Sequence, residues 1–417
     1  MTVNELLRGV DCACGKHHTC PIEAVYIENG AIDHLRDLCG VGESVLLVAD
    51  ENTYAAAGAL TEAALSHARV RKHVFDGSTV MVPDERAIEA VEAVLGDARQ
   101  LIAIGSGVMQ DLCKYLSHVH GIPYIVVCTA PSMDGYASNG AAMILNGMKH
   151  TVAAGLPRAL LADVEVLRHA PLEMIKAGYG DVIGKYSALN DWKLSRVVND
   201  EYFCPYIYGL TMEKVSRTGE LAEGLLARRA ESVQALMEAL VVIGILMSFA
   251  GSSRPASGSE HHLSHFFEIT GIVKNRPYLT HGIDVAYSTV VTAALREELL
   301  QKPFPATTFR EPRAAYEQAM NEVYGPVGAG CVALQDKVGH YDRDRATTYR
   351  AHEEELREIL REMPTAREIE EMLTTVELDM SEFYALYGRQ TIEQAVRYAK
   401  DLKDRYTVLW MHYDFLN

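Results

Sequence analysis

The sequence has no apolar segment long enough to cross a membrane. Its longest apolar stretch, ALVVIGILMSFAG at residues 239–251, has thirteen residues, whereas a transmembrane helix needs about 20. The first residues, MTVNELLRGVDCACGKHH, also lack an apolar run of the length found in signal peptides. We therefore interpret 239–251 as a buried core helix, and we expect a cytoplasmic protein whose eight cysteines are reduced thiols.

Basic residues are too few for a protein whose main partner is a polyanion. Lysine and arginine number 39 against 56 aspartates and glutamates, which gives a formal net charge of -17. This balance argues against nucleic acid or an anionic membrane surface as the main partner. A small anionic ligand remains compatible with it, because a helix N-terminus or a few local cations can hold a phosphate.

Internal repeats and low-complexity linkers are also missing, yet the chain is too long for one typical core. Up to about residue 165, short strand-like runs alternate with helical stretches, which predicts a parallel sheet covered on both faces. After Pro171, long amphipathic segments replace the strands. The sequence therefore predicts an α/β domain at 1–165 and an all-helical domain at 166–417. The expected strands are 24–30, 44–50, 70–77, 100–107 and 124–130, and the expected helices are 31–40, 53–68, 84–96 and 108–120.

Three of the cysteines, Cys12, Cys14 and Cys20, gather in the stretch DCACGKHHTC. With His17 and His18 they match half of a zinc ribbon. A ribbon needs a second ligand pair at a defined distance, and none follows. We favour a turn or the start of a strand here, and metal binding or a redox role is the alternative.

Two loops that follow predicted strands are rich in small residues. In LIAIGSGVMQD, the strand ends in GSG at 105–107 and a helix opens, so free backbone N–H groups could hold a phosphate. The usual dinucleotide fingerprint has a third glycine where this chain has Gln110, so a turn without a ligand is an equal alternative. The loop CTAPSMDGYASNGAAMI at 128–144 follows the next strand, with Asp134 in its middle. Both loops should face one crevice at the carboxyl end of the sheet.

Four of the sixteen histidines fall within 21 residues, at His261, His262, His265 and His281. The first and third are spaced i, i+4, and the second and third i, i+3, so either pair could face one point from a helix. HHLSH is close to the zincin pattern, but His262 stands where that motif has its glutamate base, which argues against a metalloprotease.

A catalytic divalent metal needs about three protein ligands and one open position. The best-placed carboxylate is Asp181 in AGYGDVIGKYSALNDW. Asp191 lies ten residues further on, and spacing alone does not exclude it. The residues by themselves therefore leave open which acid and which histidines would bind the ion.

These segments follow one another in a recognisable order: GSGVMQD, SMDGYAS, GDVIGKYSALNDW, SRPASGSEHHLSH and LTHG. Over residues 12–285 the chain resembles the iron-dependent alcohol dehydrogenase and dehydroquinate synthase-like superfamily, and it is most similar to the sn-glycerol-1-phosphate dehydrogenases. The resemblance implies an N-terminal nucleotide-binding domain and a helical metal-binding domain. It also implies reduction of dihydroxyacetone phosphate to sn-glycerol 1-phosphate with NAD(H) or NADP(H), a role in phospholipid biosynthesis, and a homodimer.

The resemblance also implies a ligand set for one divalent metal, which could be zinc, nickel or iron(II). The ligands would be Asp181, His262 and His281. His265 would lie close to substrate or nicotinamide and is the candidate proton donor, and His261 would point away.

The remaining implied contacts belong to nucleotide and substrate. Asp134 would bind a substrate hydroxyl, and Arg254 or Lys149 would hold the substrate phosphate. Arg254 could equally pair with a carboxylate. The residues implied for the nucleotide are Asp50, Gly105, Ser106, Gly107, Asp111, Thr129 and Ser132.

Three other functions remain as alternatives. A dehydroquinate synthase-like cyclase would have glutamate where Asp181 stands, so the aspartate favours a net dehydrogenase. An unphosphorylated polyol dehydrogenase, of the glycerol dehydrogenase kind, is disfavoured by the SRPASGSEHH context. A non-catalytic nucleotide-binding regulator is disfavoured by the apparently complete ligand set.

Overall fold

The structure is a computed structural model that describes residues 2–79, 81–145 and 148–416. The chain forms two compact units, which we name the sheet unit and the helical unit. The sheet unit comprises Met1–Tyr179 and Glu220–Ser252, and the helical unit comprises Gly180–Gly219 and Ser253–Asn417. The predicted single boundary at residues 165 and 166 differs from this grouping, because a later segment of the chain returns to the sheet unit.

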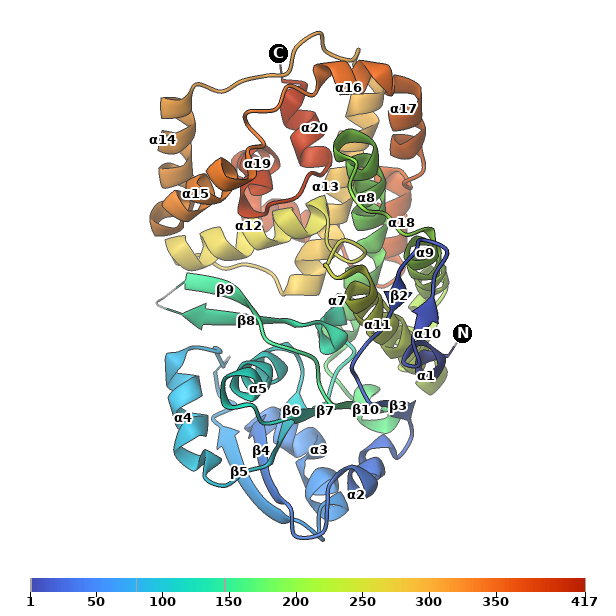
Figure 1. The fold of residues 1–417 in the computed structure, drawn as a ribbon, viewed down its shortest axis with the longest axis vertical. Coiled ribbons are helices and arrows are strands. Elements are labelled where there is room, and N and C mark those ends of the chain that lie inside the picture. Colours follow the sequence, from blue (N-terminus) through green and yellow to red (C-terminus); the bar gives the residue numbers. More distant parts are fainter. Residues whose placement is uncertain (1, 80, 146–147, 417) are drawn as a thin grey trace. The chain divides into compact units, whose positions relative to one another are not determined.

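Six parallel strands, drawn in blue to green in Figure 1, form the main sheet in the order β3-β10-β7-β6-β4-β5. Strands such as SVLLVAD at 44–50 are apolar along their whole length because helices cover both faces of a parallel sheet. The strands are β3 (Ala24–Glu28), β4 (Ser44–Asp50), β5 (Arg69–Phe75), β6 (Gln100–Gly105), β7 (Tyr124–Cys128) and β10 (Ala159–Asp163).

Helices connect these strands and bury apolar faces against them. The core includes Leu47, Ile102 and Val127 of the strands and Ala57 of α3, and each large side chain buried in this way stabilises the fold by about 1.5–3 kcal/mol. The α/β fold class predicted from the sequence is confirmed. The helices are η1 (Ala31–His34), α2 (Leu35–Leu38), α3 (Glu51–Ala64), α4 (Glu85–Leu95), α5 (Gly107–His120) and α6 (Val164–Leu167).

Some strands were not predicted from the sequence. β8 (Gly140–Leu145) and β9 (Met148–Ala153) form an antiparallel hairpin, so the end of the expected loop 128–144 is a strand. A second, shorter hairpin follows helix α1 (Val3–Leu6) and is formed by β1 (Val10–Asp11) and β2 (His17–His18). It agrees with the turn or strand start favoured from the sequence at DCACGKHHTC. Short strands of small or polar residues carry little β-propensity, so their pairing partners decide the structure.

The apolar stretch at 239–251 belongs to α11 (Ala230–Ala250), which follows the short helix α10 (Ala222–Leu226) in the sheet unit. By length and composition α11 could cross a membrane, but 78% of its most apolar window is buried inside the protein. It packs against the 3-10 helix η2 (Asp134–Ala137) and against α6. This agrees with the predicted core helix.

The helical unit begins within α7 (Leu172–Ile183), and all its described regular elements are helices, as the sequence predicts. One core cluster includes Leu194, Leu299, Leu356 and Trp410. The helices are α8 (Lys185–Asn199), α9 (Pro205–Gly219), α12 (Ser259–Lys274), α13 (His281–Gln301), α14 (Arg313–Tyr324), η3 (Gly325–Val327), α15 (Gly328–Val338), α16 (Ala346–Ala351), α17 (Glu353–Arg361), α18 (Ala366–Thr374), α19 (Met380–Tyr398), η4 (Ala399–Leu402) and α20 (Val408–Asp414).

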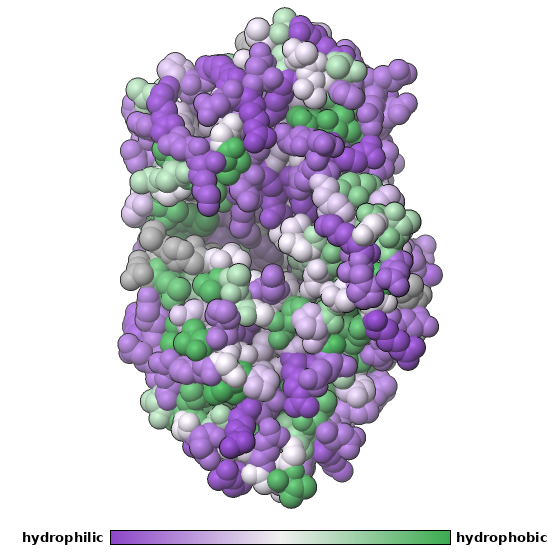
Figure 2. All heavy atoms as spheres, in the orientation of Figure 1, coloured by the Kyte–Doolittle hydropathy of each residue, from purple (hydrophilic) through white to green (hydrophobic). Residues whose placement is uncertain are grey.

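Hydrophilic side chains predominate on the face of the molecule drawn in Figure 2, and apolar ones occur in separate groups. The exposed large apolar residues come from distant parts of the sequence, as Val41, Leu60, Val119 and Tyr384 illustrate. Scattered exposure of this kind is normal for a protein surface and indicates no particular partner.

Candidate functional site

Three potential metal ligands converge inside the helical unit. One ligand atom from each of Asp181, His261 and His281 can be chosen so that all lie within 4.8 Å of one another. Asp181 and His261 are buried, and His281 at the start of α13 is partly exposed. A carboxylate and two imidazoles that are open on one side form a donor set suited to zinc, nickel or iron(II).

Small residues around Asp181 bring these helices together. A Cβ atom at Gly180 would lie 2.6 Å from the carbonyl oxygen of Gly282 and 2.7 Å from Cβ of Ala286. Only glycine fits at this distance, so the end of α7 and the first turn of α13 are in direct contact. This contact brings Asp181 close to His281.

The ring of His261 is held in one orientation by its neighbour. Nδ1 of His261 lies 2.7 Å from Oε1 of Glu260, and that oxygen also accepts a 2.8 Å hydrogen bond from the backbone N–H of Gly258. Because an ionised carboxylate only accepts, Nδ1 carries the proton. Nε2 lies 3.5 Å from Oδ1 of Asp181. This arrangement is typical of metal-binding histidines, in which one ring nitrogen binds the metal and the other donates to a carboxylate.

Asp181 is ionised in this site. Its burial opposes ionisation, but the ammonium of Lys185 and the ring of His261 hold the pKa of Asp181 below its ordinary value. Nζ of Lys185 donates to Oδ1 of Asp181 at 2.6 Å, and both side chains are fully buried. The sequence reasoning did not single out Lys185, although its i, i+4 spacing from Asp181 is a signal for a helical ion pair.

His262, a ligand implied by the family resemblance, is not in the group of ligand atoms that converges at Asp181 in the described residues. It is buried, and within the described residues neither of its ring nitrogens has a hydrogen-bond partner. Its pKa is lowered by burial and by nearby cations, of which Arg405 has the largest effect. Consecutive residues of a helix point about 100° apart, so His261 and His262 cannot both face Asp181. The structure places His261, which was expected to point away, in that position.

His265 lies beside this group, as expected for a residue one turn along α12. Its ring centroid is 5.6 Å from that of His281 and 6.2 Å from that of His261. It is partly exposed. The ring is therefore close enough to act on a molecule bound at the metal ligands.

Asp191, the alternative carboxylate, is used elsewhere. Its Oδ1 accepts hydrogen bonds from Arg296 at 2.7 Å and from the backbone N–H of Val408 at 2.8 Å. Its Oδ2 accepts from the backbone N–H of Ser259 at 2.6 Å. Asp191 thus holds the first turn of α12, the helix that carries His261, and we assign it a positioning role.

In the sheet unit, the two small-residue loops lie at one edge of the sheet. Strands β6 and β7 are parallel neighbours, so the triplet Gly105, Ser106 and Gly107 and the segment from Thr129 onward leave the sheet at the same end. The backbone N–H of Thr129 donates to the Gly105 carbonyl at 3.2 Å, and the hydroxyls of Ser106 and Ser132 are 2.5 Å apart. The structure therefore brings these predicted nucleotide residues together.

Gln110 stands where the dinucleotide fingerprint has its third glycine, and its side chain contacts the second loop. Its Nε2 donates to the carbonyl of Tyr136 at 2.7 Å, and the Tyr136 hydroxyl donates to the carbonyl of Ala130 at 2.7 Å. These bonds tie α5 to the second loop. Lys114, a buried residue not singled out in the sequence, adds a 2.8 Å bond from Nζ to the carbonyl of Gly140. Burial lowers its pKa, and Asp111 opposes this.

The predicted acidic residues of the sheet unit lie at the same edge. Asp50 ends β4 and caps α3, because its Oδ1 accepts from the backbone N–H of Thr53 at 2.8 Å. Asp111 lies in the second turn of α5, 3.5 Å from Nζ of Lys114. Asp134 is buried at the start of η2. The cap gives Asp50 a structural role, and the predicted contact with a ribose stays a prediction.

Arg254 and Lys149 were the two side chains proposed to bind a substrate phosphate, and the structure describes only the side chain of Arg254. Arg254 is buried, and its guanidinium donates to both carboxylate oxygens of Glu201, at 2.6 and 2.5 Å, and to the carbonyl of Tyr406 at 2.8 Å. This is the carboxylate pairing named as its alternative. Lys149 lies in β9, but its side chain is outside the described part of the structure.

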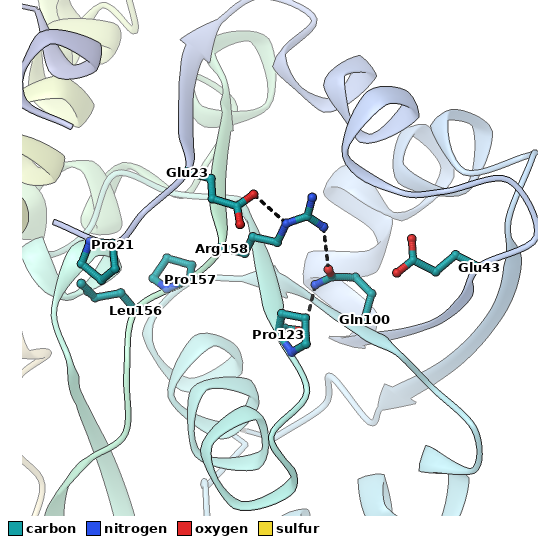
Figure 3. Close-up of a pocket in the computed structure, with 8 residues that line it drawn as sticks. All are labelled: Pro21, Glu23, Glu43, Gln100, Pro123, Leu156, Pro157 and Arg158. Carbon is teal, nitrogen blue, oxygen red and sulfur yellow. Dashed lines mark hydrogen bonds and ion pairs between the residues drawn. The ribbon is translucent and has the colours of Figure 1, made fainter. Parts of the chain in front are cut away.

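A hollow of about 460 Å³ lies at the opposite, amino edge of the sheet (Figure 3). Arg158 there donates to Glu23 at 2.9 Å and to Gln100 at 3.3 Å, and Gln100 donates to the carbonyl of Pro123 at 2.9 Å. These groups satisfy one another and hold strand starts together. Ligands of parallel sheets bind at the carboxyl edge, so we interpret this hollow as structural.

Comparison with known proteins supports the assignment of family. The family profile described as iron-containing alcohol dehydrogenase matches residues 26–171. A protein named glycerol-1-phosphate dehydrogenase [NAD(P)+] from Bacillus licheniformis is 31% identical over 408 residues, which cover 95% of this chain and 90% of the relative. One of the same name from Geobacillus stearothermophilus is 32% identical over 420 residues, covering 97% and 95%.

The chain belongs to the glycerol-1-phosphate dehydrogenase family. The resemblance seen in the sequence motifs is thereby confirmed, and with it the class of NAD(P)-dependent oxidoreductases. The fold of this dehydrogenase family member also matches a solved structure, an iron-containing alcohol dehydrogenase from Thermococcus thioreducens. The TM-score is 0.59 at 13% identity, with 95% of this chain and 99% of that chain covered.

Proposed function

We propose that the protein reduces dihydroxyacetone phosphate to sn-glycerol 1-phosphate, using NADH or NADPH and one divalent metal. The observation that carries this proposal is the largely buried donor set of Asp181, His261 and His281 in a chain that matches glycerol-1-phosphate dehydrogenases over almost its full length. The name of those relatives, glycerol-1-phosphate dehydrogenase, supports glycerol 1-phosphate as the product, and its sn configuration is part of the proposal.

We propose Asp181, His261 and His281 as the metal ligands, which revises the predicted set at one position. A bound zinc, nickel or iron(II) ion would supply Lewis acidity toward a carbonyl oxygen, and a bound nicotinamide would supply a hydride. Glu260 orients His261, and Lys185 keeps Asp181 ionised. Burial and Lys185 lower the pKa of His261, but Asp181 and Glu260 outweigh them and raise it. Nε2 of His261 would therefore have to lose any proton to serve as a ligand.

Reduction of a ketone also needs one proton at the oxygen. His265 is the candidate donor because its partly exposed ring lies 5.6 Å from that of His281. The nucleotide is proposed to bind at Gly105, Ser106 and Gly107, where α5 begins and backbone N–H groups can receive a phosphate. The other proposed contacts of nucleotide and substrate are Asp50, Asp111, Thr129, Ser132 and Asp134.

The substrate phosphate needs a cation other than Arg254. Lys403 and Arg405 precede α20 and lie close enough to His262 to lower its pKa. Arg405 is partly exposed and donates to the carbonyl of Ser257 at 3.0 Å. Burial and the neighbouring positive charge of Arg254 lower the pKa of Arg405 to about 10. An anion bound beside Arg405 would offset this repulsion between the two cations. We propose Arg405 as the phosphate ligand from the helical unit.

Steady-state kinetics test the function. Metal-stripped protein is reconstituted separately with zinc, nickel and iron(II), and oxidation of NADH and NADPH is followed with dihydroxyacetone phosphate, with dihydroxyacetone as the control. Metal-dependent turnover of the phosphate far above the control supports the proposal. Turnover of neither compound contradicts it, and equal turnover of both contradicts the phosphate site. Light scattering of the same protein checks the expected homodimer.

Arg405→Met sharpens the test. Loss of a charged contact to phosphate should raise KM for dihydroxyacetone phosphate by about 10-fold or more, while the slow turnover of dihydroxyacetone stays the same. An equal loss for both compounds would mean that Arg405 acts on the fold and not on the phosphate.

A further inference from the structure

The first residues of the sheet unit form a tight hairpin whose turn carries two cysteines. Strands β1 and β2 pair Val10 with His18. In the turn, the backbone N–H of Cys12 donates to the carbonyl of Lys16 at 3.1 Å, and that of Gly15 donates to the carbonyl of Cys12 at 3.0 Å. These bonds return the chain over five residues, so thiols from the turn and a ring from β2 can lie close together.

Three side chains of this hairpin form what we name the hairpin cluster: Cys12, Cys14 and His18. Their ligand atoms all lie within 4.8 Å of one another. Sγ of Cys14 is 3.4 Å from Nε2 of His18. A sulfur and a nitrogen bound to the same tetrahedral zinc ion are about 3.6 Å apart, given Zn–S near 2.3 Å and Zn–N near 2.05 Å. The observed separation fits a shared ion.

The ring of His18 is held with the required nitrogen toward the thiols. Its Nδ1 lies 3.0 Å from the backbone carbonyl oxygen of Phe249 in α11, and the two rings stack at 5.3 Å. A carbonyl only accepts, so Nδ1 carries the proton and the lone pair of Nε2 is directed toward the thiol of Cys14. His18 is buried, with 1% of its surface exposed, whereas Cys12 and Cys14 are partly exposed. Metal can therefore reach the thiols while the imidazole is fixed.

We propose that the hairpin cluster binds a zinc ion that is distinct from the metal at Asp181. Two soft thiolates and one imidazole form a donor set that suits zinc, and they differ from the carboxylate and imidazoles of the helical unit. Binding releases the thiol protons. The three side chains occupy three of the four positions of a tetrahedral ion, and the fourth takes a water molecule or a further thiol. The site fastens the N-terminal hairpin to α11 through His18 and Phe249.

Metal content of the full-length protein tests the proposal. Protein loaded with zinc and then desalted should hold about two equivalents per chain, one for each donor set. Cys12→Ser, Cys14→Ser and His18→Ala should each lose about one equivalent, measured by plasma mass spectrometry. His17→Ala is the matched control, because His17 is exposed and pairs with Asp11 at 2.7 Å, and it should lose none.

Cobalt(II) distinguishes the two sites directly. Thiolate ligands give cobalt an intense charge-transfer absorption in the near ultraviolet that histidine and aspartate do not give. This band should persist in Asp181→Ala, so its outcome is independent of the proposed reaction, and it should vanish in Cys14→Ser. Its intensity counts the thiolates and so identifies the fourth ligand. Unchanged metal content in all three cluster variants, or bound cobalt without the sulfur band in Asp181→Ala, would overturn the proposal.

Discussion

His18 and His261 share one feature: a hydrogen bond fixes Nδ1, and Nε2 is directed toward a proposed metal site. Their surroundings differ. His18 donates Nδ1–H to a backbone carbonyl and turns Nε2 toward the thiol of Cys14. His261 donates Nδ1–H to Glu260 and turns Nε2 toward Asp181. His18 stands on a short hairpin, four residues from Cys14 and six from Cys12, although its Nδ1 partner Phe249 is 231 residues away. His261 is buried among helices. Its Nδ1 partner Glu260 is adjacent in sequence, but the other proposed ligands, Asp181 and His281, are 80 and 20 residues away.

This difference separates two kinds of metal site. The three residues of the hairpin cluster are close in sequence and are supported by a turn, which suits a fastening role. The group at Asp181 carries charge before any metal arrives, because Lys185 is fully buried beside the carboxylate. Buried charges destabilise a fold unless they are paired. Neighbouring polar and charged side chains of the helical unit must therefore pair with them. This free-energy cost of burying charged groups is expected at a catalytic site.

Removing a ligand of the buried group should have the largest effect. His261→Ala should lower metal-dependent reduction of dihydroxyacetone phosphate by more than the 10–100-fold typical of partners that only orient a ligand. Bound metal at this site should be lost with it. His262→Ala is the matched control on the next position of the same helix and should retain the metal. If His262→Ala loses the ion and His261→Ala keeps it, the predicted ligand set was right and the revised one is wrong.

The second-largest effect should be on stability, when the hydrogen bonds that Asp191 makes near the buried group are removed. Asp191→Ala leaves Arg296 buried without its carboxylate and frees the first turn of α12. Loss of one partner of a buried ion pair costs about 3–5 kcal/mol. Urea unfolding should show this decrease in the free energy of unfolding. A loss below about 1 kcal/mol would mean that Arg296 finds another partner or water.

Changing the group that orients His261 should have an intermediate effect. Glu260→Gln keeps an oxygen that can accept from His261 and Gly258 but removes the charge. We expect metal affinity at this site to fall by about 10–100-fold, measured by competition with a chelator. Excess metal should restore activity. If activity stays low at saturating metal, Glu260 has a further role in the reaction.

The same contrast explains which features could be predicted from the sequence. Strand β4 is predicted with its observed bounds, Ser44–Asp50, because a doubly covered strand is a continuous apolar run. β10, with sequence ALLAD, was not predicted, because it is short and rich in alanine, which has little β-propensity. The strand-end loops were placed at one edge because parallel strands require it.

The candidate metal ligands show where sequence reasoning ends. Asp181 and His281 follow from the family resemblance, but the choice between His261 and His262 depends on the rotation of α12. That rotation is determined by where the helix begins, and Asp191 holds its first turn through the N–H of Ser259. A contact over 68 residues leaves no trace in the spacing of the histidines. The three residues of the hairpin cluster lie within seven positions, so its cysteines were already conspicuous in the sequence, but the orientation of His18 depends on Phe249, 231 residues away.

The smallest expected effect concerns the turn of the hairpin. Gly15 has φ of +86°, and a Cβ atom there would meet nothing within 4 Å. Gly15→Ala therefore carries only the backbone cost of a left-handed conformation, about 1 kcal/mol, which should speed zinc loss from the hairpin cluster about 5-fold in a chelator assay. Gly42→Ala is the control, because Gly42 has φ of +72° and equally open space but lies outside the hairpin. Equal zinc loss in both variants would show that alanine acts through global stability, and the contrast between a locally supported and a network-supported site would then fail.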